Sequence, residues 1–253
     1  MSLRVTLATA SRVLHQLRRD PRTLALLLFV PPVLMTLFRY VLDGQPETFD
    51  RVGGPMVGLF PLITMFLVTS IAMLRERTTG TLERLMSMPL AKADLLLGYG
   101  AAFALVAAIQ ATITTFVALA FLGLDVDGPV WLVVLLAIAN ALLGVALGLF
   151  LSAFATTEFQ AVQFMPAVIL PQLLLCGLIV PRNRMADLLE TVSAVLPMTY
   201  AIEALERATA GDTDSRLAFD AAVVLGSVAV ALGLGATTCA AERRRPPDGN
   251  RGK

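Results

Sequence analysis

The chain has little charge and few side chains suited to catalysis. Only 15% of its 253 residues are charged, whereas a soluble domain carries about 25%. It has one histidine, His15, and two cysteines, Cys176 and Cys239, which lie within apolar runs and are expected to act as small buried apolar side chains. No carboxylate pair or cluster of metal ligands stands out. We therefore expect no catalytic residue and no metal site.

The chain also lacks a phosphate-binding loop. The pattern G-x-x-x-x-G-K-[ST] is absent, since the Gly-Lys pair at Gly252-Lys253 is followed by no Ser or Thr. We expect the chain to bind no cofactor and to hydrolyse no ATP by itself.

Long apolar runs dominate what is present. Hydrophobic residues make up 57% of the chain and the mean hydropathy is +0.76. The runs are about twenty residues long, the length that a helix needs to cross a bilayer. We predict an all-α integral membrane protein with six transmembrane helices, at 23–42, 55–74, 95–124, 130–155, 159–180 and 219–241. Residues 1–241 would form one domain, followed by a basic tail at 242–253.

The basic residues predict the orientation of these spans. If the termini and the loops after spans two and four share one side, that side holds 14 of the 20 Lys and Arg residues, and the other holds 6 against 12 acidic residues. By the positive-inside rule we expect both termini in the cytoplasm of a multi-pass cell-membrane protein. The basic N-terminal region is too long for a signal peptide and no small-residue cleavage site follows, so we expect it to be retained.

Charged side chains are scarce inside the spans. Away from their ends, spans two to six contain no Asp, Glu, Lys, Arg or His, and span one contains only Arg39, near its outer end. An isolated charge at the centre of a membrane costs at least about 2.5 kcal/mol and is kept for a task such as ion coupling. This scarcity argues against an ion-coupled carrier and against an intramembrane enzyme. Energy for active transport would have to come from a partner.

Two cytoplasmic segments are candidates to receive that partner. The first, residues 1–22, should form an amphipathic helix that Asp20-Pro21 ends. Its apolar arc is Leu3, Leu7, Ala10, Leu14 and Leu17, and its basic arc is Arg4, Arg12, His15, Arg19 and Arg22. We expect it to lie along the inner membrane surface, where anchoring to acidic lipids and docking of a cytoplasmic subunit are compatible roles.

The second segment is the loop at 75–92. Gly80 offers a break, Thr81 a helix N-cap and Pro89 a stop, so one or two helical turns are expected. Their apolar patch would be Leu82, Leu85 and Met86, flanked by Glu83 and Arg84. Such a segment is either a solvated connector or a helix that seats in a groove of another protein.

This loop also carries a family resemblance. The run from Glu76 to Leu85, followed by Met88-Pro89, resembles the E-x-x-x-G-T-L-E-x-L-x-x-x-P pattern of type-2 ATP-binding-cassette (ABC) exporter permeases. A second block resembles the same family and comprises Pro166, Pro171, Gly177, Pro181, Leu196-Pro197, Tyr200 and Glu206-Arg207. Within that family the chain looks closest to daunorubicin-resistance-like drug efflux permeases, and a bacterial source is expected.

The resemblance implies partners and contacts. It implies a homodimer of permeases, with a heterodimer as the alternative, bound to two copies of a cytoplasmic ABC ATPase that would hold ATP and Mg. ATPase contacts are implied at Glu76, Gly80, Thr81, Leu82, Glu83, Arg84, Leu85, Arg12 and Arg19. The implied activity is export of hydrophobic drug-like or lipid-like molecules. Export of polysaccharide or glycolipid, a stand-alone carrier or channel, and a regulatory membrane subunit remain alternatives, and no nucleic-acid partner is expected.

The fifth span and the segment after it are unusual. Gln160, Gln163 and Gln172 lie on a helix that Pro166 and Pro171 should bend, either as packing contacts or along a substrate path. By the resemblance, that path follows a dimer interface, and its candidates are Thr64, Thr69, Gln163, Phe164 and Gln172.

Residues 182–217 should form an outer helical hairpin. Its first helix carries the apolar stripe Met185, Leu188, Leu189, Val192, Val195 and Leu196. Pro197 should end that helix, and a second is expected at about 201–209. The two helices either rest at the outer interface or, as the resemblance implies, form a re-entrant pair that closes the exit.

Overall fold

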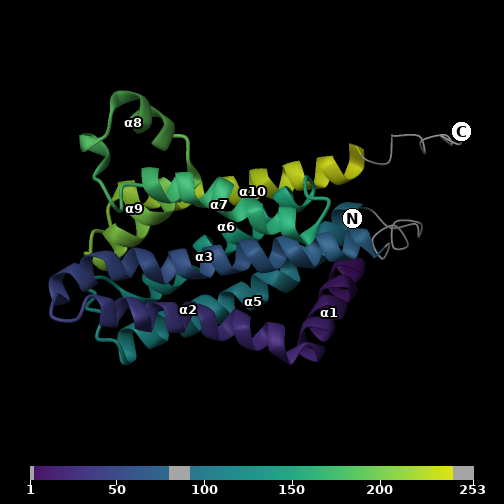
Figure 1. The fold of residues 1–253 in the computed structure, drawn as a ribbon, viewed down its shortest axis with the longest axis horizontal. Helices are drawn as coiled ribbons and strands as arrows, with labels where there is room; N and C mark the ends of the chain where they lie inside the picture. The colour runs from purple at the N-terminus through teal and green to yellow at the C-terminus, as the bar shows by residue number, and fades with distance from the viewer. Residues whose placement is uncertain (1–2, 80–91, 242–253) are drawn as a thin grey trace, which may run out of the picture.

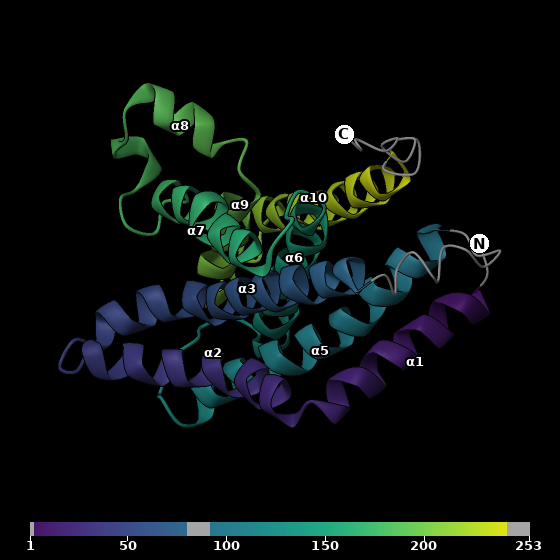
Figure 2. The ribbon, with the colours of Figure 1, turned by 45° about the vertical axis from the view of Figure 1, so that its right-hand side comes forward.

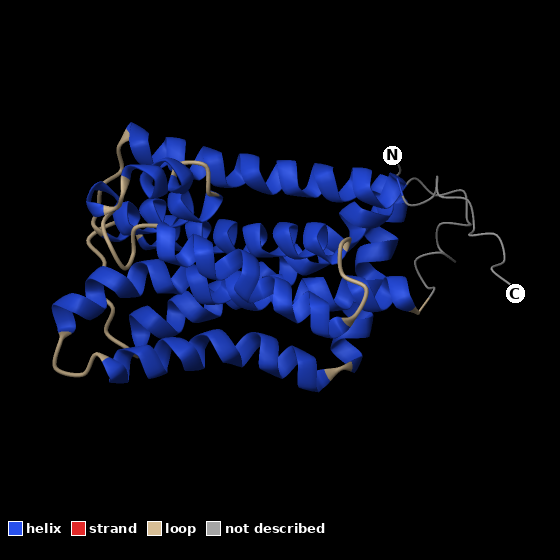
Figure 3. Ribbon diagram, turned by 45° about the horizontal axis from the view of Figure 1, so that its top comes forward, coloured by secondary structure: helices blue, strands red, loops and turns tan. Residues whose placement is uncertain are grey.

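The computed structural model describes residues 3–79 and 92–241, and every regular element in these ranges is helical (Figure 1; Figure 3). The helices are α1 (Leu3–Arg19), α2 (Pro21–Val41), α3 (Pro46–Thr78), α5 (Lys92–Ala120), α6 (Val130–Ser152), α7 (Glu158–Leu175), the 3-10 helix η1 (Arg182–Arg184), α8 (Asp187–Ser193), α9 (Pro197–Thr209) and α10 (Ser215–Ala241). Within these ranges, six are long and apolar enough to cross a membrane: α2, α3, α5, α6, α7 and α10. The predicted all-α membrane fold with six spans is confirmed.

The break between the first two helices lies where the sequence predicts it. α1 ends at Arg19 and α2 begins at Pro21. Asp20 accepts hydrogen bonds from the Oγ1 and the backbone N of Thr23, at 2.6 and 3.2 Å, and these bonds lower the pKa of the Asp20 carboxyl. The break lets α1 leave the direction of α2, and the start of α1 lies at the same end of the bundle as the end of α10 (Figure 1).

Two of the predicted span boundaries differ from those in the structure by five residues or more. α3 begins at Pro46 instead of 55 because tertiary contacts, such as those of the buried Phe49, extend the helix beyond its most apolar stretch. α7 ends at Leu175, before the predicted end at 180. Gly177 adopts a φ of 97° there, and an α-helix does not continue through that conformation.

The centre of the bundle is the pair α3 and α6. A Cβ on Gly144 would lie 2.2 Å from the carbonyl oxygen of Leu62, and a Cβ on Gly148 would lie 2.6 Å from that of Phe66. Glycine therefore lets the two backbones approach closely, as is typical of helix packing in membranes. α5 and α9 pack around this pair and α10 packs against α6, whereas only 22%, 17% and 22% of the most apolar windows of α2, α7 and α10 are buried.

The outer hairpin is a bent helix pair. α8 and α9 meet at 82°; α9 packs among α3, α6 and α10, and α8 stands away from the bundle (Figure 2). α9 begins at Pro197 and not near 201, since proline is favoured at the first helical position. The predicted hairpin of two helices is confirmed, but its first helix ends at Ser193, before Pro197, which starts the second helix instead.

Candidate functional sites at the two ends of the bundle

A polar cluster ties α1 to two of the spans. Arg12 of α1 lies 3.6 Å from Glu76 Oε2 of α3 and donates a hydrogen bond to the hydroxyl of Tyr99 in α5. The Arg12 guanidinium also lies over the Tyr99 ring, 5.6 Å from its centroid. Gln16 Nε2 donates to Glu76 Oε1 at 3.3 Å. These four residues, here called the inner junction, join α1, α3 and α5.

Close packing supports the inner junction. A Cβ on Gly98 of α5 would lie 2.5 Å from the Cβ of Thr9, so α1 and α5 touch there. Ala10 and Val13, from the face of α1 that meets α5, are buried, whereas Leu7 is 59% exposed. The apolar arc that was expected to face lipid is therefore partly used for packing within the protein.

The remaining predicted ATPase contacts are placed differently. Arg19 lies exposed at the end of α1, outside the inner junction. Gly80, Thr81, Leu82, Glu83, Arg84 and Leu85 lie outside the described residues. Their segment follows α3, which ends at Thr78, and precedes α5, which begins at Lys92. Both helices that flank the segment therefore reach the inner junction.

A cavity of about 570 Å³ opens beside the inner junction, between α1, α2, α3 and α5. Val68, Ile71 and Phe103 supply an apolar wall, and Asp20 and Glu76 supply polar groups. Its volume falls within the range of small-molecule pockets, about 300–1,000 Å³. These walls suit an amphipathic molecule better than a fully polar one.

The five candidate path residues do not share one surface. Thr69 and Gln172 are buried, with Thr69 packed against α6. Phe164 is half-buried among apolar side chains. Gln163 is exposed on α7 and Thr64 is half-exposed on α3. Of the five, Gln163 is exposed and Thr64 and Phe164 are partly exposed, so these three can be reached by a molecule beside the helices in this conformation.

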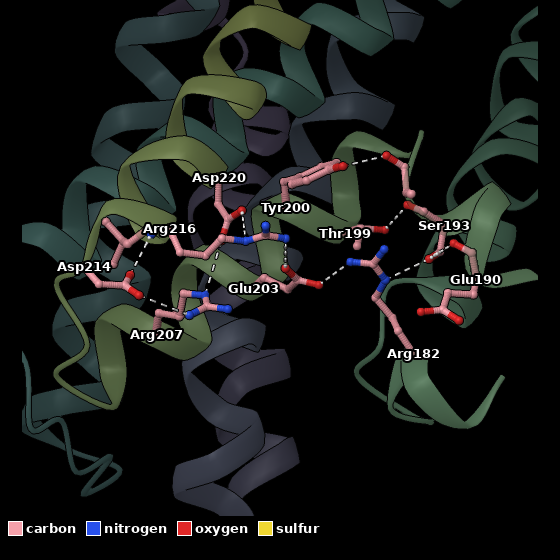
Figure 4. Close-up of polar contacts among 12 residues, drawn as sticks. Arg182, Glu190, Ser193, Thr199, Tyr200, Glu203, Arg207, Asp214, Arg216 and Asp220 are labelled. Atoms are coloured by element: carbon pink, nitrogen blue, oxygen red, sulfur yellow. Dashed lines mark hydrogen bonds and ion pairs between the residues drawn. The ribbon is translucent and has the colours of Figure 1, made fainter.

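The opposite end of the bundle holds a larger ionic cluster, here called the outer network (Figure 4). It consists of three arginines and three carboxylates: Arg182, Arg207, Arg216, Glu203, Asp214 and Asp220. Glu203 of α9 accepts a hydrogen bond from Arg182 Nη1 at 2.7 Å and lies 3.9 Å from Arg216 Nη2. Asp220 of α10 lies 3.4 Å from Arg207 Nε and 3.5 Å from Arg216 Nε. The outer network thus joins the segment after α7 to α9 and α10.

Asp220 lies near the start of the sixth span, about one turn further inside its helix than predicted. α10 begins at Ser215, before the predicted 219, and Asp214 caps its first turn by accepting from the backbone N of Leu217 at 3.0 Å. Asp220 therefore lies inside the helix, where it is 0% exposed. The sequence signal that would have found this pairing is the i, i+4 spacing of Arg216 and Asp220.

An open cavity of about 1060 Å³ lies against the outer network. It is lined by the carboxylates Glu47, Asp50, Asp125, Asp127, Glu190, Glu203 and Glu206 and by the arginines Arg51, Arg182, Arg207 and Arg216. The buried Cys176, just after α7, also lines it. The surface of this outer cavity is therefore acidic on balance, unlike the apolar wall of the inner one.

Comparison with known proteins identifies the family. The model of the ABC-2 type transporter family matches residues 4–208, most of the chain from α1 through α9. The chain belongs to the ABC-2 type transporter family. The resemblance carried by the Glu76–Pro89 loop is confirmed at this level, and the daunorubicin-resistance-like assignment stays a prediction.

Curated proteins similar to this ABC-2 type chain are transporters and permeases. ABC transporter G family member 20 of Dictyostelium discoideum is 25% identical over 64% of this chain and 22% of its own length. The probable multidrug ABC transporter permease YbhR of Escherichia coli K12 is 26% identical over 57% of this chain and 39% of its own. The inner membrane transport permease YhhJ of the same strain is 24% identical over 67% and 45%. The matched segments span less than half of each of these relatives.

Proposed function

We propose that this ABC-2 type chain is the membrane-spanning permease subunit of an ATP-driven exporter whose ATPase is a separate cytoplasmic protein. Family membership supports a transport role, and the lack of a phosphate loop in this sequence supports a partner that holds ATP and Mg. The scarcity of charge inside the spans favours an external energy source. The buried Asp220 does not change this, because it is paired with two arginines and is not an isolated titratable group.

The inner junction is the observation that carries the coupling role. Arg12 contacts Glu76 near the end of α3 and Tyr99 near the start of α5. The segment between these two helices is the one in which the ATPase contacts are predicted. A displacement of that segment would therefore reach three helices together. In the proposed cycle, ATP closes the ATPase dimer, the segment moves as a lever, and the spans change from inward-open to outward-open.

The exposed helices support a dimer. Only 22% and 17% of the most apolar windows of α2 and α7 are buried within the chain. We assign these faces to a second copy, with Thr64 and Gln163 near the shared surface, and two ATPase subunits at the inner junctions. Both chain termini would be cytoplasmic. The apolar wall of the inner cavity and the multidrug name of YbhR support hydrophobic drug-like or lipid-like cargo.

Reconstitution with the ATPase tests the coupling role. Arg12→Ala should lower substrate-stimulated ATP hydrolysis by about fivefold or more, since coupling free energies between sites are about 1–3 kcal/mol. Tyr99→Phe keeps the ring and loses the hydroxyl, so its loss should be smaller. Arg4→Ala, at an exposed position of the same helix, is the matched control and should resemble the parent. If Arg12→Ala hydrolysed ATP at the parental rate, the inner junction would not take part in coupling.

The partner itself is tested by co-purification. Replacing both Glu83 and Arg84 by alanine should reduce the amount of ATPase that co-purifies, while membrane insertion is retained. Undiminished co-purification would make the predicted contact wrong. Substrate flux from the reconstituted chain alone would instead support the stand-alone carrier.

A further inference from the structure

The outer hairpin is braced internally by short hydrogen bonds. Thr199 Oγ1 donates to the carbonyl oxygen of Ser193 at 2.8 Å, and the Tyr200 hydroxyl donates to that of Ala194 at 2.6 Å (Figure 4). Arg182 Nε donates to Ser193 Oγ at 2.9 Å. The first two bonds cross the bend between α8 and α9, and the third joins η1 to α8, so together they hold the hairpin as one unit.

Ion pairs, and not short hydrogen bonds, join α9 to α10. Asp220 of α10 faces Arg207 of α9 at 3.4 Å, and Glu203 of α9 faces Arg216 of α10 at 3.9 Å. The pair of Asp220 with Arg216, at 3.5 Å, lies within α10. Both carboxylate oxygens of Asp220 and the Nε of Arg207 are buried without a hydrogen bond. Buried charges in that condition contribute little net stability, because desolvation offsets much of their attraction. The apolar side chains of α9, such as Ile202 and Leu205, are buried in the bundle, and the charges set how α9 meets α10.

The members of this joint differ in their access to water. The side chains of Arg207 and Arg216 are 32% and 49% exposed, whereas that of Asp220 is 0% exposed. The two arginines also line the acidic outer cavity, where other carboxylates lie. They can therefore change partners as α9 moves, and Asp220 is the fixed member of the joint.

We propose that Asp220 is a positioning residue: its buried charge, paired with Arg207, holds α9 against α10, and the hairpin opens as a unit when Arg207 leaves Asp220 and Arg216 leaves Glu203 for other carboxylates of the outer cavity. The role of this opening in export rests on the proposed function. The joint itself does not, because it is contained within one chain.

Cys176 supplies a native reporter of the opening. It is 1% exposed and lines the outer cavity, and burial raises the pKa of its thiol, so the closed state should label slowly. The experiment uses the full chain in nanodiscs with the second cysteine removed by Cys239→Ser, and follows labelling of Cys176 by a charged maleimide. Asp220→Asn should speed labelling about tenfold, because a buried thiol reacts through the open state.

Matched variants separate charge from packing. Asp220→Glu keeps the charge and should label within about twofold of the parent, and so should Asp214→Asn, whose carboxylate is 55% exposed. Asp220→Asn combined with Arg216→Gln removes one charge of each sign, so the net charge of the outer network is unchanged. This double variant should again label about tenfold faster, and it provides the test if the single variant does not fold.

The proposal is overturned if the neutral variants label at the parental rate, or if Asp220→Glu accelerates labelling as much as Asp220→Asn does. No ATPase is needed for this measurement. Failure of the proposed function would therefore leave the labelling result unchanged, and the two failures can be told apart.

Discussion

The two ends of the bundle use arginine and carboxylate side chains in contrasting ways. At the inner junction, Arg12 has a hydroxyl, an aromatic face and a carboxylate as partners, and these come from two other helices. In the outer network, Arg182 donates a hydrogen bond to Glu203, but Asp220, which faces both α9 and its own helix, has ion pairs and no hydrogen bond. Charge-assisted hydrogen bonds fix a geometry, whereas a buried charge without them leaves a geometry that can change. This difference agrees with the two proposals, in which the inner junction transmits a displacement and the joint between α9 and α10 changes its partners.

This contrast requires a stiff connection between the two ends, and the pair α3 and α6 provides it. Gly144→Ala should lower the free energy of unfolding by about 3 kcal/mol, the upper range for overpacking, because the new methyl group would meet the backbone oxygen of Leu62. Gly226→Ala on α10 is the matched control. Nothing lies within 4 Å of a Cβ there, so alanine should be neutral or stabilise the helix by up to about 1 kcal/mol.

Reversible unfolding in mixed micelles measures both glycine variants. Equal effects of the two substitutions would show that the α3 and α6 contact is not the stiff element. Transmission between the ends would then have to follow another route.

Removing one carboxylate at each end compares the two sites directly. Asp220→Asn should lower the free energy of unfolding by about 2 kcal/mol, since it leaves two arginines without their buried partner. Glu76→Gln should cost less than about 1 kcal/mol, because Arg12 keeps Tyr99 and is 31% exposed. The same unfolding assay applies. A larger loss for Glu76→Gln would reverse the contrast between the two ends.

Much of this fold is predictable because membrane crossing imposes a length on each apolar run. The spans and the break at Asp20-Pro21 follow from local composition and from the backbone limits of proline. The sequence also predicts the hairpin, through an apolar stripe followed by a proline. Its bend of 82° was not, because the bend depends on where α9 packs.

The sites were less predictable, since their partners are distant in the sequence. Arg12, Glu76 and Tyr99 meet only after α1 has turned back onto α5. The family resemblance indicates Arg12 and Glu76, but no feature of the sequence near Tyr99 marks it as their partner. Hydropathy locates only the apolar part of a helix, so it places Asp220 at the very start of the sixth span. In the structure α10 begins earlier, at Ser215.

The smallest expected effect concerns another ion pair at the inner end. Arg75 Nε lies 2.8 Å from Glu158 Oε1, but the two side chains are 59% and 53% exposed. Arg75→Ala should therefore change the free energy of unfolding by less than about 0.5 kcal/mol, and added salt should remove the difference. Substrate-stimulated hydrolysis with the ATPase should stay close to parental, in contrast to Arg12→Ala. If the two variants lost coupling equally, the inner end would act through its overall charge, because Arg75 has the same charge as Arg12 but pairs with Glu158 of α7 and does not join three helices.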